Sequence, residues 1–382
     1  MIEGADISLK VLSRISDVSE DVWDSLHGSR NPFISHAYLD ALEQSGAVSA
    51  ETGWLVRHIL LEDKNGAPLA AQPLYLKSHS YGEYVFDQGW AEAYENAGGR
   101  YYPKLQSSIP FTPASAPRLL TQRPELRSTL VELGKELTAA MGASSLHATF
   151  LSDDDATLYE QTGYLIRHDR QYHWHNQNYA SFDDFLSGLT SRKRKMIRKE
   201  RQQVSDAGIT IHCHTGASIT SAHWDALHAF YHDTSTRKWG RPYLNRDTFQ
   251  LIGERMPDKC LLVFAEQNRE IIAGALNFIG ADTLYGRHWG CAKPLPFLHF
   301  ELCYYQAIEF AITHGLKTVE AGAQGEHKIA RGYTPVTTKS AHFIRDEGFK
   351  SAVDDFLKRE RKAIADEVDW LTKFAPFHRQ EN

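Results

Sequence analysis

The chain has 382 residues, a length that fits two or three domains, and we expect two. Hydrophobic residues make up 42% and charged residues 24%, a globular composition that excludes a disordered or fibrous chain. The formal net charge is −6, so any contact with a polyanion must be local. The four cysteines are widely spaced without a C-x-x-C pair, which argues against a disulfide scaffold and a cysteine-based zinc site.

The first residues carry Glu3 and Asp6, where a secretory signal needs a basic and then an apolar run. The sequence also has no run of about 18 apolar residues that would span a membrane. We therefore expect a cytoplasmic protein.

The first half of the chain predicts a mixed α/β pattern. The sequence Asp63-Lys64-Asn65-Gly66 predicts a hairpin turn. The expected strands are 7–15, 54–63, 68–77, 82–90, 145–150 and 164–175, and the expected helices are 36–45, a helix opened by Pro124, and 155–161.

The second half repeats this plan and ends in a helix with one apolar stripe. The other expected helices are 181–206, 219–236, 246–256 and 299–314, and the expected strands are 210–214, 260–267, 271–279, 283–290, 317–322 and 337–344.

The two halves predict a duplicated α/β fold, with domains at 1–178 and 179–382, because each has a hairpin leading to a Tyr-rich strand and a Trp. The element order resembles that of the GNAT acyltransferases, in which two neighbouring parallel strands splay apart. Here the splayed pair would be 283–290 and 317–322.

The segment 291–299, which follows the first of these two strands, has two prolines and no glycine, so it is poorly suited to cradle a diphosphate.

Several blocks of the sequence resemble the FemAB-like family of predicted N-acyltransferases, a branch of the GNAT superfamily. The blocks are 32–46, 73–91, 101–113, 191–201, 274–290, 297–312 and 319–335. The resemblance implies a tandem GNAT-like fold and transfer of an acyl or aminoacyl group to an amine, in cell-envelope or peptidoglycan precursor metabolism. Better-known Fem enzymes use charged tRNA. The donor here stays open between acyl-CoA and aminoacyl-tRNA, and we expect no tightly bound cofactor.

The segment from Glu320 to Lys328 holds the richest set of polar candidates, directly after a predicted parallel strand. Amine acylation needs a base and a group that stabilises the oxyanion. Glu320, Glu326 and His327 are the candidate bases, and Lys328 is the candidate partner of an acyl or phosphate oxygen. Gln324 is a candidate substrate-binding residue. The alternative is a surface turn with a charged rim.

The predicted strand 283–290 and the helix after it supply further candidates. Alternation places Tyr285, Arg287 and Trp289 on one face, where they suit a carboxylate or phosphate group. His288 on the other face is another candidate base. Glu301 and Tyr304 share a helix face and are candidate substrate-binding residues. Buried ion pairing and ordinary helix packing are the alternatives.

The remaining candidates are polar residues elsewhere in the chain. Lys238 lies in a loop expected over the cleft, and Asp87 and Lys104 are expected to bind substrate in the groove between the domains. The basic run 191–201 predicts a contact with tRNA, a nucleotide diphosphate or an anionic lipid surface, and its alternative is a solvated helix face. The residues of this run that we expect to bind phosphate are Arg192, Lys195, Arg198 and Lys199.

Two other hypotheses follow from the same sequence. His228 and His232 have the spacing of helical metal ligands, but without a third converging ligand we expect no metal. A non-catalytic module that recognises a cell-wall precursor or RNA is the alternative to an acyltransferase. The oligomeric state is not predicted.

Overall fold

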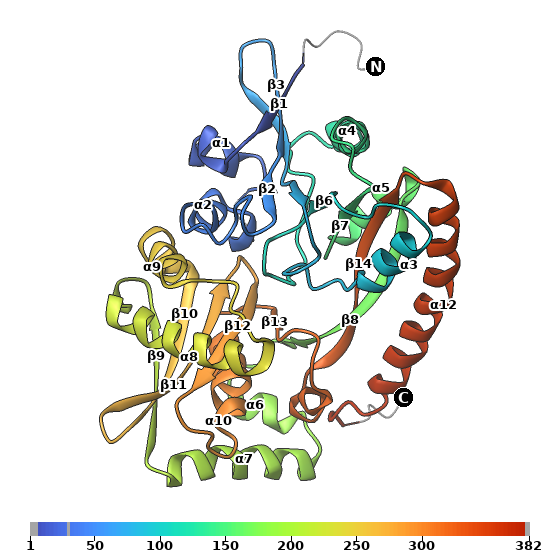
Figure 1. Cartoon of the computed structure of the whole chain (residues 1–382). Coiled ribbons are helices and arrows are strands. Elements are labelled where there is room, and N and C mark those ends of the chain that lie inside the picture. The colour runs from blue at the N-terminus through green and yellow to red at the C-terminus, as the bar shows by residue number, and fades with distance from the viewer. Residues whose placement is uncertain (1–6, 29–30, 379–382) are drawn as a thin grey trace. The chain divides into compact units, whose positions relative to one another are not determined.

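The computed structural model describes residues 7–28 and 31–378, apart from the side chains of residues 238 and 239. The chain forms two compact units, each built from two separate stretches of sequence (Figure 1). Unit 1 takes the chain up to Asp169 together with Thr338–Ala365, and unit 2 takes Arg170–Thr337 and the chain from Asp366. The domain boundary expected between residues 178 and 179 stays a prediction.

Unit 1 contains a small sheet, in the order β1-β3-β4, and a second run of strands in the order β2-β5-β6-β7-β14. The strands are β1 (Ser8–Leu12), β2 (Trp54–Val56), β3 (His58–Glu62), β4 (Pro68–Gln72), β5 (Tyr75–Lys77), β6 (Lys104–Ser107), β7 (Ser145–Ala148) and the later β14 (Thr334–Ile344). The helices are α1 (Glu20–Ser25), α2 (His36–Gln44), α3 (Gln88–Asn96), α4 (Leu126–Ala140) and α5 (Asp153–Gln161), with the first part of α12 (Glu347–Thr372).

Unit 2 contains strands in the order β9-β10-β11-β12-β13-β8. The strands are β8 (Leu165–His175), β9 (Ile209–Thr215), β10 (Cys260–Gln267), β11 (Glu270–Ile279), β12 (Thr283–Cys291) and β13 (Thr318–Glu320). The helices are α6 (Phe182–Ser187), α7 (Ser191–Asp206), α8 (Ser221–Trp239), α9 (Arg246–Arg255), α10 (Leu298–Phe300), the π-helix η5 (Glu301–Tyr305), α11 (Gln306–Thr313) and the 3-10 helix η6 (Glu326–Arg331).

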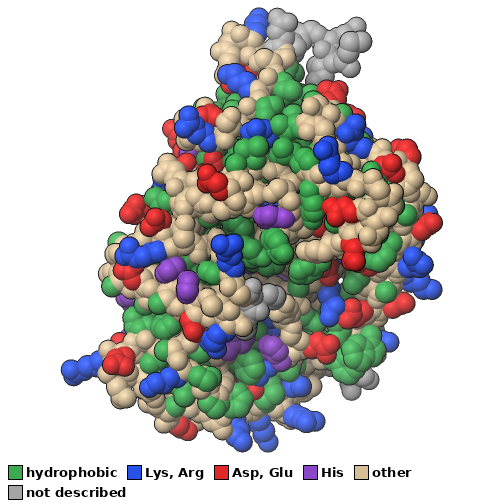
Figure 2. Space-filling view, in the orientation of Figure 1, with side chains coloured by type: hydrophobic (Ala, Val, Ile, Leu, Met, Phe, Trp, Pro, Cys, Tyr) green, Lys and Arg blue, Asp and Glu red, His purple; other side chains and the backbone are tan. Residues whose placement is uncertain are grey.

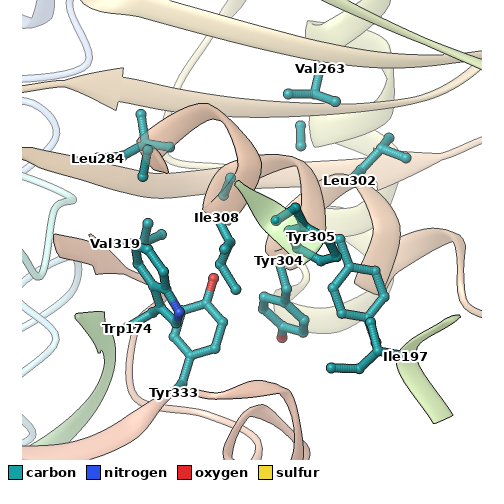
Figure 3. Close-up of a cluster of buried hydrophobic side chains, with 14 of the residues drawn as sticks. Trp174, Ile197, Val263, Leu284, Leu302, Tyr304, Tyr305, Ile308, Val319 and Tyr333 are labelled. Carbon is teal, nitrogen blue, oxygen red and sulfur yellow. The ribbon is translucent and has the colours of Figure 1, made fainter. Parts of the chain in front are cut away.

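One face of the unit 2 sheet carries the main apolar core. Leu284 of β12 and Val319 of β13 are fully buried there, against Leu302 and Ile308 from the helices that follow β12 (Figure 3). Helix α8 packs on the opposite face, against β11 and β12 (Figure 1). Because side chains alternate along a strand, the residues next to Leu284 and Val319 point toward the α8 face.

The same order of strand pairings occurs in both units. In unit 1, β5 pairs antiparallel with β6, β6 parallel with β7, and β7 antiparallel with β14. In unit 2, β11 pairs antiparallel with β12, β12 parallel with β13, and β13 antiparallel with β8. This repeat confirms the predicted α/β class and the tandem GNAT-like architecture.

Four predicted elements differ from the structure. The strands expected over 54–63 and 68–77 are each two strands, β2 with β3 and β4 with β5, whose members belong to different sheets. Residues 82–90 form a loop followed by the start of α3, because Gly82 and Tyr84 have positive φ angles of 82° and 59° that a strand does not accommodate. The single helix expected over 181–206 is two helices, since α6 ends before Gly188 and Thr190, the residue before α7, has non-helical backbone angles. Among the described residues, no helix is both long and apolar enough to cross a membrane.

Candidate active site

The parallel strands β12 and β13 separate after a short paired stretch. They pair from Thr283 with Thr318 to Tyr285 with Glu320. Beyond this point the chain after β13 stays bonded to β8, where the Ala321 amide donates to the Tyr172 carbonyl at 3.2 Å. Within the described chain, no strand pairs with that edge of β12 beyond Tyr285. The predicted splay of this strand pair is therefore present.

Lys328 lies at the carboxyl end of β13, where the separation begins. Its ammonium donates to the carbonyls of Ala321 and Gly322, at 2.5 and 3.2 Å. The side chain is buried, and this burial lowers the pKa of Lys328 to about 8. A buried ammonium held by two neutral carbonyls keeps an uncompensated positive charge, which favours an anionic group next to it.

Glu320 and His173 lie beside each other on the neighbouring strands β13 and β8. They are a register pair, and Nε2 of His173 is 4.0 Å from Oε1 of Glu320. Burial lowers the pKa of His173 to about 3, so its imidazole is neutral near pH 7. Glu320 therefore sits beside a neutral ring rather than a cation, in a position suited to accept a proton.

A π-helix follows β12 and carries two of the predicted residues. Such short π-helical stretches occur frequently at functional sites. The Tyr304 hydroxyl is hydrogen-bonded to Nε2 of His327, at 3.0 Å. Glu301 is buried and accepts from the Arg201 guanidinium, with an Oε1–Nη2 distance of 3.0 Å. Glu301 and Tyr304 thus contact different segments.

A β-bulge in β12 changes the faces predicted for this strand. Leu276 of β11 pairs with His288 and the next residue pairs with Gly286, which leaves Arg287 as the extra residue. His288 packs against Tyr231 of α8, with ring centroids 4.8 Å apart, whereas Trp289 lies 5.1 Å from His299 on the opposite side. The expectation that Tyr285 and Trp289 share a face is wrong, because the bulge shifts the alternation by one residue.

His288 is placed poorly for proton transfer at neutral pH. Burial and the neighbouring Arg287 lower its pKa well below the usual value for histidine. Its ring also packs against Tyr231 of α8. Gln324 and Glu326 are exposed on the turn that follows β13. Lys238 belongs to α8 and not to the expected loop, and its side chain lies outside the described residues.

Asp87 and Lys104 belong to a buried charged cluster in unit 1. The Lys104 ammonium donates to the carboxylates of Asp87 and Glu83, the latter at 2.7 Å. Lys77, opposite Lys104 in the β5–β6 pair, lies 3.5 Å from the centre of the Trp54 ring. Burial lowers the pKa of Lys77 to about 7 and raises that of Glu83 to about 7. Oε1 of Glu83 and Oδ1 of Asp87 are buried without a hydrogen-bond partner among the described residues, and substrate binding by Asp87 and Lys104 stays a prediction.

The basic helix α7 has a charged outer face. The side chains of Arg192, Lys195, Arg198 and Lys199 are exposed. Figure 2 shows Lys and Arg side chains gathered along the lower edge of the view, where Figure 1 places α7. Arg198 pairs with Asp183, at 2.9 Å, in an ion pair open to water. The helix therefore offers a cationic surface, as the sequence predicted.

Sequence reasoning missed three buried residues behind the Lys328 turn. Glu200 on the inner face of α7 accepts from Arg331 and from the Tyr305 hydroxyl. These residues are 131 and 105 positions from Glu200 in the chain, so no local spacing reveals the contact. The only local signal for this contact in the sequence was a glutamate among the basic residues of α7.

Among the described residues, no three His, Cys, Asp or Glu side chains converge as metal ligands.

Comparisons with known proteins agree with this fold. The FemAB-like family model, described as peptidoglycan biosynthesis/recognition, matches residues 14–379. The solved structure of FemX is similar at 11% identity and a TM-score of 0.56, covering 88% of this chain and 98% of that chain. The C-terminal domain of a putative lysylphosphatidylglycerol synthetase from Agrobacterium fabrum is similar at 9% identity and a TM-score of 0.52, covering 90% and 96%. No curated protein matches.

The match and the fold define a transferase of the acyl or aminoacyl class with a tandem GNAT-like architecture. The chain belongs to the FemAB-like family, as its sequence blocks predicted.

Proposed function

We propose that this chain transfers an aminoacyl group to an amine of a peptidoglycan precursor, at the opening between β12 and β13. The observation that carries the proposal is the separation of these strands beside the buried Lys328. The free edge of β12 supplies backbone hydrogen-bonding groups for a bound acyl chain. The family description supports a peptidoglycan precursor as the acceptor.

The chemistry assigns one role to each polar group at the opening. The acceptor amine attacks the donor carbonyl and becomes positively charged, and Glu320 accepts a proton from it. The oxygen of the tetrahedral intermediate becomes negative, and the Lys328 ammonium stabilises it. The intermediate then collapses: the ester C–O bond breaks, the amide bond remains, and the leaving oxygen takes the proton held by Glu320 and departs as an alcohol. Tyr304 and His327 line the approach on the Lys328 side.

Two observations favour aminoacyl-tRNA over acyl-CoA as the donor. The exposed face of α7 carries cations suited to a nucleic-acid backbone. The loop before α10 contains Pro294 and Pro296 and no glycine, so it offers few amides for a diphosphate. A cytoplasmic location, where charged tRNA is made, is consistent with this donor and stays a prediction.

The test is turnover with a peptidoglycan precursor peptide and either charged tRNA or acyl-CoA. We expect transfer from charged tRNA, and loss of transfer in Lys328→Met and Glu320→Gln with precursor binding retained. Lys317→Met is the matched control, because Lys317 is exposed in the segment before β13. Precursor binding without transfer from either donor would favour a recognition module instead.

A further inference from the structure

A buried ion pair ties α7 to the turn that carries Lys328. Oε1 of Glu200 accepts from Nη2 of Arg331 at 2.7 Å, and Oε2 accepts from Nε at 3.2 Å. The Tyr305 hydroxyl donates to the same carboxylate. Glu200, Tyr305 and Arg331 are each at most 6% exposed. One carboxylate thus joins α7, the π-helix η5 and the 3-10 helix η6.

The Arg331 guanidinium also holds the turn itself. Its Nη1 donates to the His327 carbonyl at 2.8 Å, and its plane lies over the Phe300 ring, 3.5 Å from the centroid. His327 is the residue directly before Lys328, and Arg331 is the last residue of η6. The guanidinium therefore fixes both the start and the end of the short helix from which the Lys328 ammonium projects.

A buried ion pair is a costly way to stabilise a fold. Removing two charges from water costs several kcal/mol per ion, and apolar replacements of a whole pair are often neutral or stabilising. Core residues such as Ile197 and Val204, on the same face of α7, already supply apolar packing. A role in geometry explains the placement of Glu200 better than a role in stability.

We infer that Glu200 is a positioning residue, which acts through Arg331 to hold the Lys328 ammonium at the opening between β12 and β13. This inference rests on the proposed function for its catalytic consequence, but the placement of the turn can be measured without any substrate.

The central experiment compares the wild-type protein with Glu200→Gln and with the double variant Glu200→Gln/Arg331→Met. The single variant leaves a buried guanidinium without its carboxylate and is expected to melt at a lower temperature. The double variant removes both charges and is expected to regain most of that stability. Because the double variant is expected to be nearly as stable as the wild-type protein, a change in the Lys328 turn in that variant is not caused by a loss of global stability. Asp183→Asn is the matched control, because it removes an exposed ion pair that Arg198 of α7 makes with Asp183 of α6.

Hydrogen exchange and lysine titration report on the turn directly. In the double variant we expect about tenfold faster exchange of the Lys328 and Tyr333 amides, which are bonded within the turn. We also expect the pKa of Lys328, read by isotope-edited NMR, to rise from about 8 toward 10.5, because a loosened turn lets water reach the ammonium. Wild-type exchange and a wild-type pKa in the double variant would overturn the inference.

Turnover supplies the second readout. With charged tRNA as the donor, we expect the double variant to lose about tenfold in kcat with the donor KM unchanged, as for an interaction made in the transition state. An unchanged kcat would overturn the inference. If the wild-type protein shows no transfer, the proposed function fails, while exchange and titration still decide whether Glu200 positions the turn.

Discussion

Tyr285 and Glu320 form the last register pair of the parallel strands β12 and β13. The next residue of β12 is Gly286, and a Cβ atom added there would lie 3.3 Å from the Glu320 carbonyl oxygen. The missing side chain at Gly286 therefore keeps the start of the opening free.

We predict that Gly286→Val narrows this opening and lowers transfer at least tenfold, while the melting temperature falls by only a few degrees. Gly89→Ala is the control, because a Cβ there meets no atom within 4 Å. Steady-state kinetics and thermal unfolding of both variants test this. Full activity in Gly286→Val would show that the opening is not the acyl site.

The charge state of Lys328 predicts a pH dependence of the rate. Its pKa of about 8 means that the ammonium predominates below pH 8 and is lost as the pH rises through this value. If the ammonium stabilises the oxyanion, kcat falls above about pH 8. Lys328→Arg keeps its charge at higher pH, so its residual activity is expected to lack this decline. A decline that persists unchanged in the Arg variant would assign the titration to another group.

The charged cluster of unit 1 predicts a large effect on stability. Lys104→Met leaves the buried carboxylates of Asp87 and Glu83 without their main cation, and we expect a loss of about 3–5 kcal/mol in the free energy of unfolding. Lys358→Met removes an exposed ion pair with Asp354 and is expected to change the free energy of unfolding far less, because water already screens these charges. Urea unfolding measures the free energy of unfolding of both variants. Equal losses in the two variants would contradict the prediction that breaking the buried ion pairs is the more destabilising change.

The outer face of α7 predicts salt-dependent binding of RNA. Replacing Arg192, Lys195, Arg198 and Lys199 by Gln is expected to weaken tRNA binding. It is also expected to reduce the slope of log affinity against log salt by about 0.7–0.9 for each phosphate that the variant no longer neutralises.

The control for this variant has the same charge change away from α7. It replaces exposed cations elsewhere, namely Lys64, Arg100, Lys259 and Lys362. Filter binding over a range of salt concentrations compares the two variants. Equal slopes would mean that α7 is a solvated face without a role in binding.

Local patterns in the sequence predict the helices and strands of unit 2 more reliably than they predict the contacts between its side chains. Periodicity predicts β10 to β13 and α8, because alternation and helical spacing are encoded within a few residues. The bulge at Arg287 has no such signal, so the faces of Tyr285 and Trp289 are predicted incorrectly. The Glu200–Arg331 pair joins distant segments, and its existence follows only from the fold.

The return of the chain to unit 1 has a consequence for biosynthesis. Strand β14 pairs with β7, from Ala341 with Ala148 to Ile344 with Ser145, almost two hundred residues after β7 is made. Until the ribosome has produced β14, this side of β7 is an unpaired edge, which is prone to association with other chains. We expect nascent chains that end before residue 338 to depend on chaperones, since unit 1 is begun first but is completed only after most of unit 2 has been made.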